Sequence, residues 1–168
     1  RAADGRPLTA MNLALADPGY HNDAETIWRK FVSRNDAIFM VLSGHQAGQS
    51  LRVDANEAGH AVYQMLADFQ DRGQAALDAG QPPGQGPALG DGWYRELTFR
   101  LDGDSPRIDV RTYSSHYRAY SSELPAYAQW YRAHEQPQMS DEEFLRADEF
   151  TIELADWRER FARATPER

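Results

Sequence analysis

His45 has the setting that most favours chemistry in this chain. It follows an apolar run over residues 37–42 and the two small residues Ser43 and Gly44. A run of this length without alternation is typical of a strand covered on both faces, and small residues let the backbone turn where the strand ends. Ligands of α/β proteins bind at such strand ends, so an imidazole held there is suited to metal ligation or general acid catalysis. A hydrogen-bonded structural histidine is an equally good interpretation of His45 taken alone.

The remaining candidates for chemistry have weaker settings. Four further histidines lie beside caps, turns or polar aromatic segments, and we expect them to be structural or solvated: His21, His60, His116 and His134. The carboxylate of Asp68 could orient a histidine, cap a loop or face water, and we favour a structural role. The polar run 112–117 could line a pocket, although Tyr and Ser at a strand end more often satisfy a local loop. No His-x-His, His-Glu-x-x-His or Asp-x-His sequence occurs, so the chain alone supplies no complete metal-ligand set.

Composition excludes several classes of function. The 168 residues include no cysteine, which excludes disulfides, thiolate zinc sites and cysteine nucleophiles and leaves His and carboxylates as the strong metal ligands. With 18 basic and 26 acidic residues, the net charge of -8 disfavours nucleic acid and anionic membranes as partners. The sequence also lacks a long uncharged apolar run, a Gly-x-Ser-x-Gly elbow and a phosphate-binding glycine loop. It therefore predicts neither a transmembrane helix, nor a serine hydrolase, nor a P-loop enzyme.

Hydrophobic periodicity predicts helices and strands in the order of an α/β chain. The helix expected over 24–34 has an inward apolar stripe of Ile27, Trp28, Phe31 and Val32. The strands expected are one over 37–43, a hairpin of 51–54 with 61–66, a second hairpin of 93–101 with 108–113, and one over 148–154.

Three further segments have local signals of their own. Residues 71–92, rich in Gly, Pro, Gln and Ala, predict a mobile surface loop. Residues 140–143, Ser-Asp-Glu-Glu, have the pattern of a capping box that opens a short helix. Residues 157–168 predict a charged, frayed tail.

Several of these blocks occur in an order that is similar to a known family. The blocks are the helix with Trp28, the strand ending Ser43-Gly44-His45, the segment 59–70 ending Leu-Ala-Asp-Phe-Gln, the turn Gly90-Asp91-Gly92-Trp93, and the strand ending Thr112-Tyr113-Ser114. Over residues 20–115 this series resembles the C-terminal part of a calcineurin-like metallophosphoesterase from a bacterial branch of that family. Several ordered blocks are more specific than the Gly-His pair alone.

The resemblance implies a fold and an activity. The fold is an α/β, or α+β, sandwich of two sheets flanked by helices, of which residues 1–168 would form the C-terminal half, with the loop 71–92 and a C-terminal extension over about 116–168. The activity is hydrolysis of a small-molecule phosphoester at two divalent metal ions, drawn from manganese, iron, zinc or calcium. His45 would be a metal ligand and the catalytic residue of this chain.

The chain departs from the family pattern in two ways. Ala47 stands where the family has a second histidine, and the early Asp-x-His, Gly-Asp and Gly-Asn-His motifs are absent from a sequence that begins at Arg1. We therefore expect most metal ligands to come from an N-terminal fragment of the same polypeptide, present as a separate chain. The alternatives are a non-catalytic binding or structural member of the fold with a degenerate metal site, and a self-sufficient α+β domain. The bacterial compartment stays open, with a secreted or periplasmic location among the options.

Overall fold

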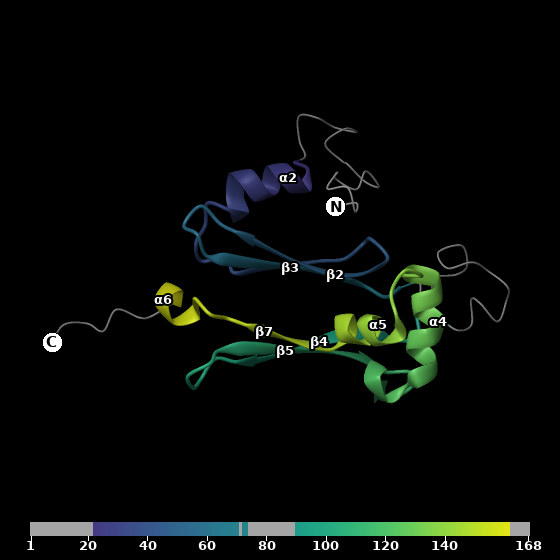
Figure 1. Cartoon of the computed structure of the whole chain (residues 1–168). Coiled ribbons are helices and arrows are strands. Elements are labelled where there is room, and N and C mark those ends of the chain that lie inside the picture. Colours follow the sequence, from purple (N-terminus) through teal and green to yellow (C-terminus); the bar gives the residue numbers. More distant parts are fainter. Residues whose placement is uncertain (1–21, 71, 74–89, 162–168) are drawn as a thin grey trace.

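Two β-sheets face each other in this protein (Figure 1). The computed structural model describes residues 22–70, 72–73 and 90–161 of the chain. The first half of the chain forms a three-stranded sheet and the second half a four-stranded one. A short helix lies on the outer side of the first sheet, and two more helices lie at one end of the sandwich (Figure 1). This arrangement confirms the expected mixture of helices with two sheets, an α+β sandwich.

The first sheet contains a parallel pair and a hairpin. Its strands are β1 (Met40–Ser43), β2 (Gly48–Ala55) and β3 (Ala61–Asp68), in the spatial order β1-β3-β2. Strand β1 runs parallel to β3, whereas β2 and β3 form the predicted antiparallel hairpin over eight paired residues. Gly59 turns this hairpin with a φ of 90°, a conformation that costs glycine little.

The second sheet is built around β5. Its strands are β4 (Trp93–Arg100), β5 (Arg107–Ser114), β6 (Ala119–Tyr120) and β7 (Phe150–Glu153). Strand β4 pairs with one side of β5, and the short strands β6 and β7 pair with the other, all antiparallel. Every second residue of β5 is buried, so one face of this sheet supports the core. The second predicted hairpin is thereby confirmed. The strand predicted over 148–154 forms over the shorter range Phe150–Glu153, since Asp148 ends a helix.

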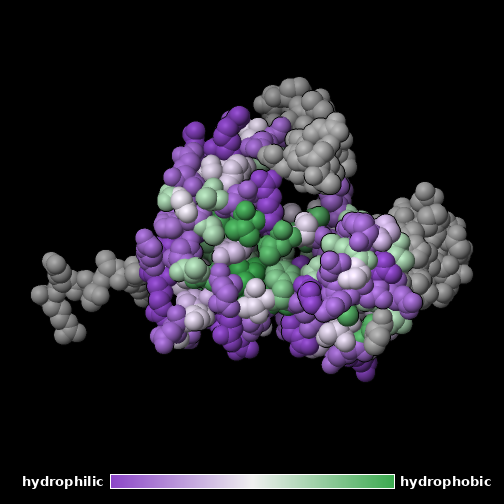
Figure 2. All heavy atoms as spheres, viewed as in Figure 1, coloured by the Kyte–Doolittle hydropathy of each residue, from purple (hydrophilic) through white to green (hydrophobic). Residues whose placement is uncertain are grey.

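Apolar side chains from both sheets fill the space between them. The buried residues of this core are Tyr63, Met65, Ile108, Val110, Ile152 and Leu154. The core reaches the surface at the β2 edge, where Leu51 and Val53 are 41% and 50% exposed. Figure 2 shows hydrophobic residues gathered there, between the two sheets. The sandwich is therefore open along this edge within the described residues.

The helix predicted over 24–34 forms with a different geometry. An α-helical turn, α2 (Ala24–Ile27), is capped by Asp23 and continues as a π-helix, η1 (Trp28–Val32). The wider turn rotates the apolar stripe away from its expected position. Val32 is buried, but Ile27 and Phe31 are 46% and 58% exposed, so the prediction that the whole stripe packs inward is wrong.

Helices follow the second sheet in the C-terminal third. They are η2 (Ser121–Glu123), α4 (Pro125–Glu135) and α5 (Asp141–Asp148). Ser140 and Glu143 form the predicted capping box at the start of α5. The sequence did not predict α4, whose Tyr-rich and Ala-rich segment packs against Phe69, Trp93 and Phe144. No helix in the described part of the chain is long and apolar enough to cross a bilayer.

The expected frayed tail begins with an ordered helix, α6 (Trp157–Phe161). Its Trp157 ring packs edge-on against Phe39 at a centroid distance of 4.9 Å. Arg160 is 1% exposed and donates to the carbonyl oxygens of Asp36, Ala61 and Ile38. These contacts correct the prediction for residues 157–161, whereas residues 162–168 lie outside the described residues.

Two other expectations need correction. The prediction that strand β1 is covered on both faces is wrong, because Leu42 is 60% exposed. Within the described residues β1 is also an edge strand, which pairs with β3 on one side. The expected surface loop 71–92 lies mostly outside the described residues, but Arg72, near its start, is fully buried. Both errors have one cause, because burial depends on which segments lie alongside and sequence periodicity does not report them.

Substitution of a core isoleucine tests the inter-sheet packing. Ile108 is 0% exposed, so Ile108→Ala is expected to lower the free energy of unfolding by about 2–5 kcal/mol through the cavity it leaves. The matched control Ile27→Ala removes the same atoms from a side chain 46% exposed and is expected to cost less than about 1 kcal/mol. Urea unfolding followed by circular dichroism measures both, and equal losses would contradict the described core.

Candidate functional site

His45 lies in the turn between β1 and β2. Its backbone has a φ of 71°, in the left-handed region that side chains with a Cβ adopt rarely. The residue is exposed, and no hydrogen bond or ion pair joins it to any residue that the structure describes. Backbone strain of this kind clusters at functional sites, so the geometry keeps the functional interpretation of His45 open.

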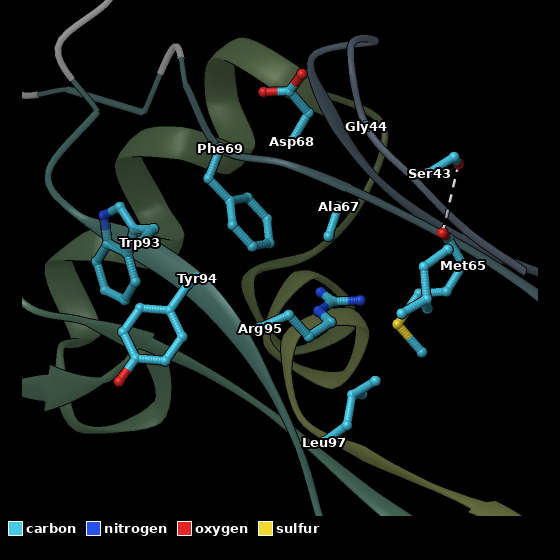
Figure 3. A pocket seen from close by; sticks show the side chains of 11 residues that line it. Ser43, Gly44, Met65, Ala67, Asp68, Phe69, Trp93, Tyr94, Arg95 and Leu97 are labelled. Atoms are coloured by element: carbon cyan, nitrogen blue, oxygen red, sulfur yellow. Dashed lines mark hydrogen bonds between the residues drawn. The ribbon is translucent and has the colours of Figure 1, made fainter.

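A cavity of about 390 Å³ opens beside this turn, between the ends of the two sheets. Figure 3 shows its walls, with Phe69, Trp93 and Tyr94 at one end and Met65 and Leu97 at the other. Ser43 and Gly44, which directly precede His45, belong to the rim, and the Ser43 hydroxyl donates to the carbonyl oxygen of Met65 at 3.4 Å. The full lining is Leu42, Ser43, Gly44, Met65, Ala67, Asp68, Phe69, Trp93, Tyr94, Arg95 and Leu97.

Charged side chains are buried beside this cavity. One carboxylate oxygen of Asp148 lies 3.4 Å from a guanidinium nitrogen of Arg72 and 3.8 Å from one of Arg95. The side chains of Arg72 and Asp148 are 0% exposed and that of Arg95 is 5% exposed. Burial of charge on this scale is unfavourable unless the groups pair. We call these three residues the buried charge cluster.

Arg95 is held by partners from two elements that are distant in sequence. Its guanidinium donates to the side-chain oxygen of Gln49 in β2 and, at 3.1 Å, to the carbonyl oxygen of Ala147 in α5. The Nε atom of Arg95 is buried without a hydrogen-bond partner among the described residues, as is the side-chain nitrogen of Gln49. Burial lowers the pKa of Arg95 to about 10, because desolvation outweighs the attraction of Asp148.

Two tyrosines of α4 enclose Arg72. The Tyr127 hydroxyl contacts the Arg72 guanidinium, and the Tyr131 hydroxyl donates to the Arg72 carbonyl oxygen at 2.6 Å. The Tyr131 hydroxyl also lies 2.9 Å from a carboxylate oxygen of Asp91. Burial, reinforced by this carboxylate, raises the pKa of Tyr131 above its usual value. Tyr131 is therefore a neutral hydrogen-bonding group at ordinary pH.

The other residues that the sequence offered as candidates for chemistry make contacts within the fold. Asp68 accepts a hydrogen bond from the backbone of Gln70 at 3.1 Å, in agreement with the favoured structural role. The ring of His60 lies 2.8 Å from Asp36, and this contact lowers the pKa of the Asp36 carboxyl. His116 packs edge-on against Tyr117. His21 lies outside the described residues, and the side chain of His134 is not described.

The polar side chains of residues 112–117 form hydrogen bonds with neighbouring residues of the fold. Thr112 donates to the carbonyl oxygen of Asp148 at 2.9 Å, and Ser114 donates to that of Asp91. The Tyr117 hydroxyl donates to the carboxylate of Asp91 at 3.0 Å. The run therefore fixes the end of β5 and does not line the cavity described above.

The described residues do not by themselves form a metal centre. No three His, Cys, Asp or Glu side chains come together within them in a way that could hold an ion. Ala47, two residues after His45, is exposed and has no coordinating atom. His45 can supply one imidazole ligand, and a complete centre needs donors from outside the described residues.

Three comparisons with known proteins found no relative for this chain. No protein-family model matches it, and neither the curated proteins nor the solved structures give a significant match.

Sequence reasoning missed Arg95, Arg72 and Asp148. A signal for Arg95 was present, because alternation along β4 assigns it to the same face as Trp93 and Leu97, which face the other sheet. A charged residue at an inward position indicates a buried partner or a binding site. No comparable signal marked Arg72, which follows a strand, or Asp148, which ends a short acidic helix.

Removal of the shared carboxylate tests the buried charge cluster. Asp148→Asn keeps the side-chain shape but leaves two buried guanidinium groups without their common anion, so we expect a loss of about 3–5 kcal/mol in the free energy of unfolding. Asp109→Asn is the control, since Asp109 also contacts two arginines but on the solvent side. Its loss is expected to be much smaller. Denaturant unfolding that finds equal losses would contradict the cluster.

A glycine substitution tests whether His45 has a structural role. His45→Gly is expected to leave the free energy of unfolding unchanged or to raise it by up to about 1 kcal/mol, because glycine adopts the observed φ without a Cβ penalty. His60→Ala is the comparison, since it removes the contact with Asp36 and is expected to destabilise the fold. A loss of more than about 2 kcal/mol in His45→Gly would identify His45 as a structural residue.

Proposed function

We propose that this chain is the C-terminal half of a metal-dependent phosphoester hydrolase of the calcineurin-like type. Its substrate is a small-molecule phosphoester, and its site is completed by a second polypeptide segment. In this proposal His45 is the metal ligand contributed by the chain, and the remaining ligands of two divalent ions come from that segment. Manganese, iron, zinc and calcium are the candidate metals, since imidazole and carboxylate ligands accept several of them.

The observation that carries the proposal is the setting of His45. An exposed imidazole with no partner among the described residues stands in a strained turn, beside a cavity, at the end of a parallel strand. A structural histidine would be expected to use its ring nitrogens within the fold, as His60 does with Asp36. The ring nitrogens of His45 are available to a ligand from outside.

The open edge of the first sheet is evidence in favour of the proposed second segment. Strand β1 is a parallel strand with a neighbour on one side only among the described residues, whereas parallel strands are usually covered and paired on both sides. Leu42 of β1 and Phe99 of β4 are 60% and 46% exposed at the same edge of the sandwich. An N-terminal fragment of the same polypeptide, as a separate chain, would pair with β1 and cover these side chains.

Ala47 supports a second candidate function. A non-catalytic member of the fold, which binds a ligand or a partner at a degenerate metal site, needs no second histidine in this turn. Metal analysis separates the two candidates, because the hydrolase requires two bound ions per intact molecule and the binding module requires none.

Turnover by the intact native protein tests the hydrolase. With added manganese we expect hydrolysis of 4-nitrophenyl phosphate or its bis-ester, and we expect His45→Ala to lower kcat/KM by at least about 100-fold, since a metal ligand is lost. His116→Ala is the matched control and should retain turnover, because the exposed His116 packs against Tyr117 and does not line the cavity.

Two results would contradict the proposal. Unchanged turnover in His45→Ala would show that His45 takes no part in the reaction. A native protein that weighs 19.1 kDa, folds alone and remains monomeric would contradict the proposed second segment.

A further inference from the structure

We propose that the cavity beside the His45 turn binds a small organic anion, with Arg95 as its anion-binding residue. The ligand class is a carboxylate or phosphate group attached to a compact apolar body, such as a single aromatic ring. This binding needs no metal ion and no second segment, so it stands independently of the proposed hydrolase.

The cavity walls suit the apolar body of such a ligand. A volume of about 390 Å³ lies within the range of small-molecule sites, which are mostly apolar with a few polar groups that fix orientation. Phe69 and Trp93 supply aromatic surface at one end (Figure 3), whereas the Tyr94 ring lies on the outward face of β4 against Tyr113. Arg95 lies between these rings and the aliphatic wall of Met65 and Leu97 (Figure 3). An aromatic ring against Trp93 would carry its anionic group toward Arg95.

Arg95 has an incompletely matched charge. Its nearest carboxylate, that of Asp148, lies 3.8 Å away, beyond hydrogen-bond distance, and is closer to Arg72 at 3.4 Å. The buried Nε atom of Arg95 has no hydrogen-bond partner among the described residues. This Nε atom is itself closed off from solvent, so an anion in the cavity would act on the charge of the Arg95 guanidinium as a whole, which Asp148, shared with Arg72, balances only in part.

The carboxylate in the cavity lining does not oppose the binding of an anion. Asp68 is the carboxylate of the lining, but it shares a face of β3 with Gln64 and Leu66, opposite to Met65. Figure 3 shows its carboxylate directed away from Arg95. Asp68 therefore does not neutralise the cavity.

Ligand titration of the intact native protein tests the proposal. Phenyl phosphate, benzoate and inorganic phosphate are titrated separately by isothermal calorimetry, with benzyl alcohol as the neutral analogue. We expect saturable binding of phenyl phosphate, benzoate or both, at least about tenfold tighter than that of benzyl alcohol, because the charged contact to Arg95 is lost in the neutral compound. The comparison of phenyl phosphate with benzoate identifies which anionic group the site prefers. The comparison of phenyl phosphate with inorganic phosphate measures how much of the affinity comes from contact of the phenyl ring with the aromatic wall.

Variants on the two faces of β4 and at the cavity rim assign the site. Arg95→Gln is expected to weaken binding at least about tenfold, whereas Arg100→Gln, an arginine of the same strand outside the cavity, should leave it unchanged. Leu42→Trp fills the rim of the cavity while Arg95 stays intact. It should also abolish binding, with circular dichroism as the check on folding.

Three outcomes would overturn the site. The first is the absence of saturable anion binding to the unaltered chain. The second is equal affinity for benzyl alcohol and the anions. The third is binding that survives Leu42→Trp in a folded protein, which decides the question even where Arg95→Gln fails to fold.

Discussion

The carboxylate of Asp148, shared between Arg72 and Arg95, is the interaction on which the arrangement of this protein depends. Asp148 ends α5, Arg95 lies in β4, and Arg72 follows β3 within four residues, so one carboxylate joins the two sheets and the C-terminal helices. Gln49 of β2 adds a further link through Arg95. Buried charges tolerate little displacement, because each loses its compensation when its partner moves. The cluster thereby fixes the geometry of the cavity beside it.

The two ends of the sandwich differ in how completely they are enclosed. At the cluster end, α4 and α5 pack over Phe69 and Trp93. Along the edges, apolar side chains reach the surface at Leu42, Leu51 and Phe99. His45 lies where the enclosed end meets the open β1 edge. A site at this position can combine a rigid anion-binding wall from this chain with ligands from a neighbouring segment.

Local sequence signals predicted the parts of the fold that local forces determine. Alternation predicted both hairpins, and the Ser140 capping box predicted the start of α5, since these patterns depend on neighbours in the chain. The coverage of β1 and the burial of Arg72 depend on segments far away in sequence, and both predictions were wrong there. The partners of Arg95 lie 46 and 52 residues away, so its charge compensation was not visible in the sequence. His45 is a candidate from the sequence because a turn after an apolar strand is a local signal, and its role stays a prediction.

The central claim is that His45 is a metal ligand in a centre that another segment completes. The most direct test is a crystal structure of the intact native protein with manganese, with the ion located by its anomalous scattering. We expect manganese within coordination distance of a ring nitrogen of His45, with its other ligands from outside the described residues. Manganese bound elsewhere, with the His45 imidazole in contact only with water, would contradict it.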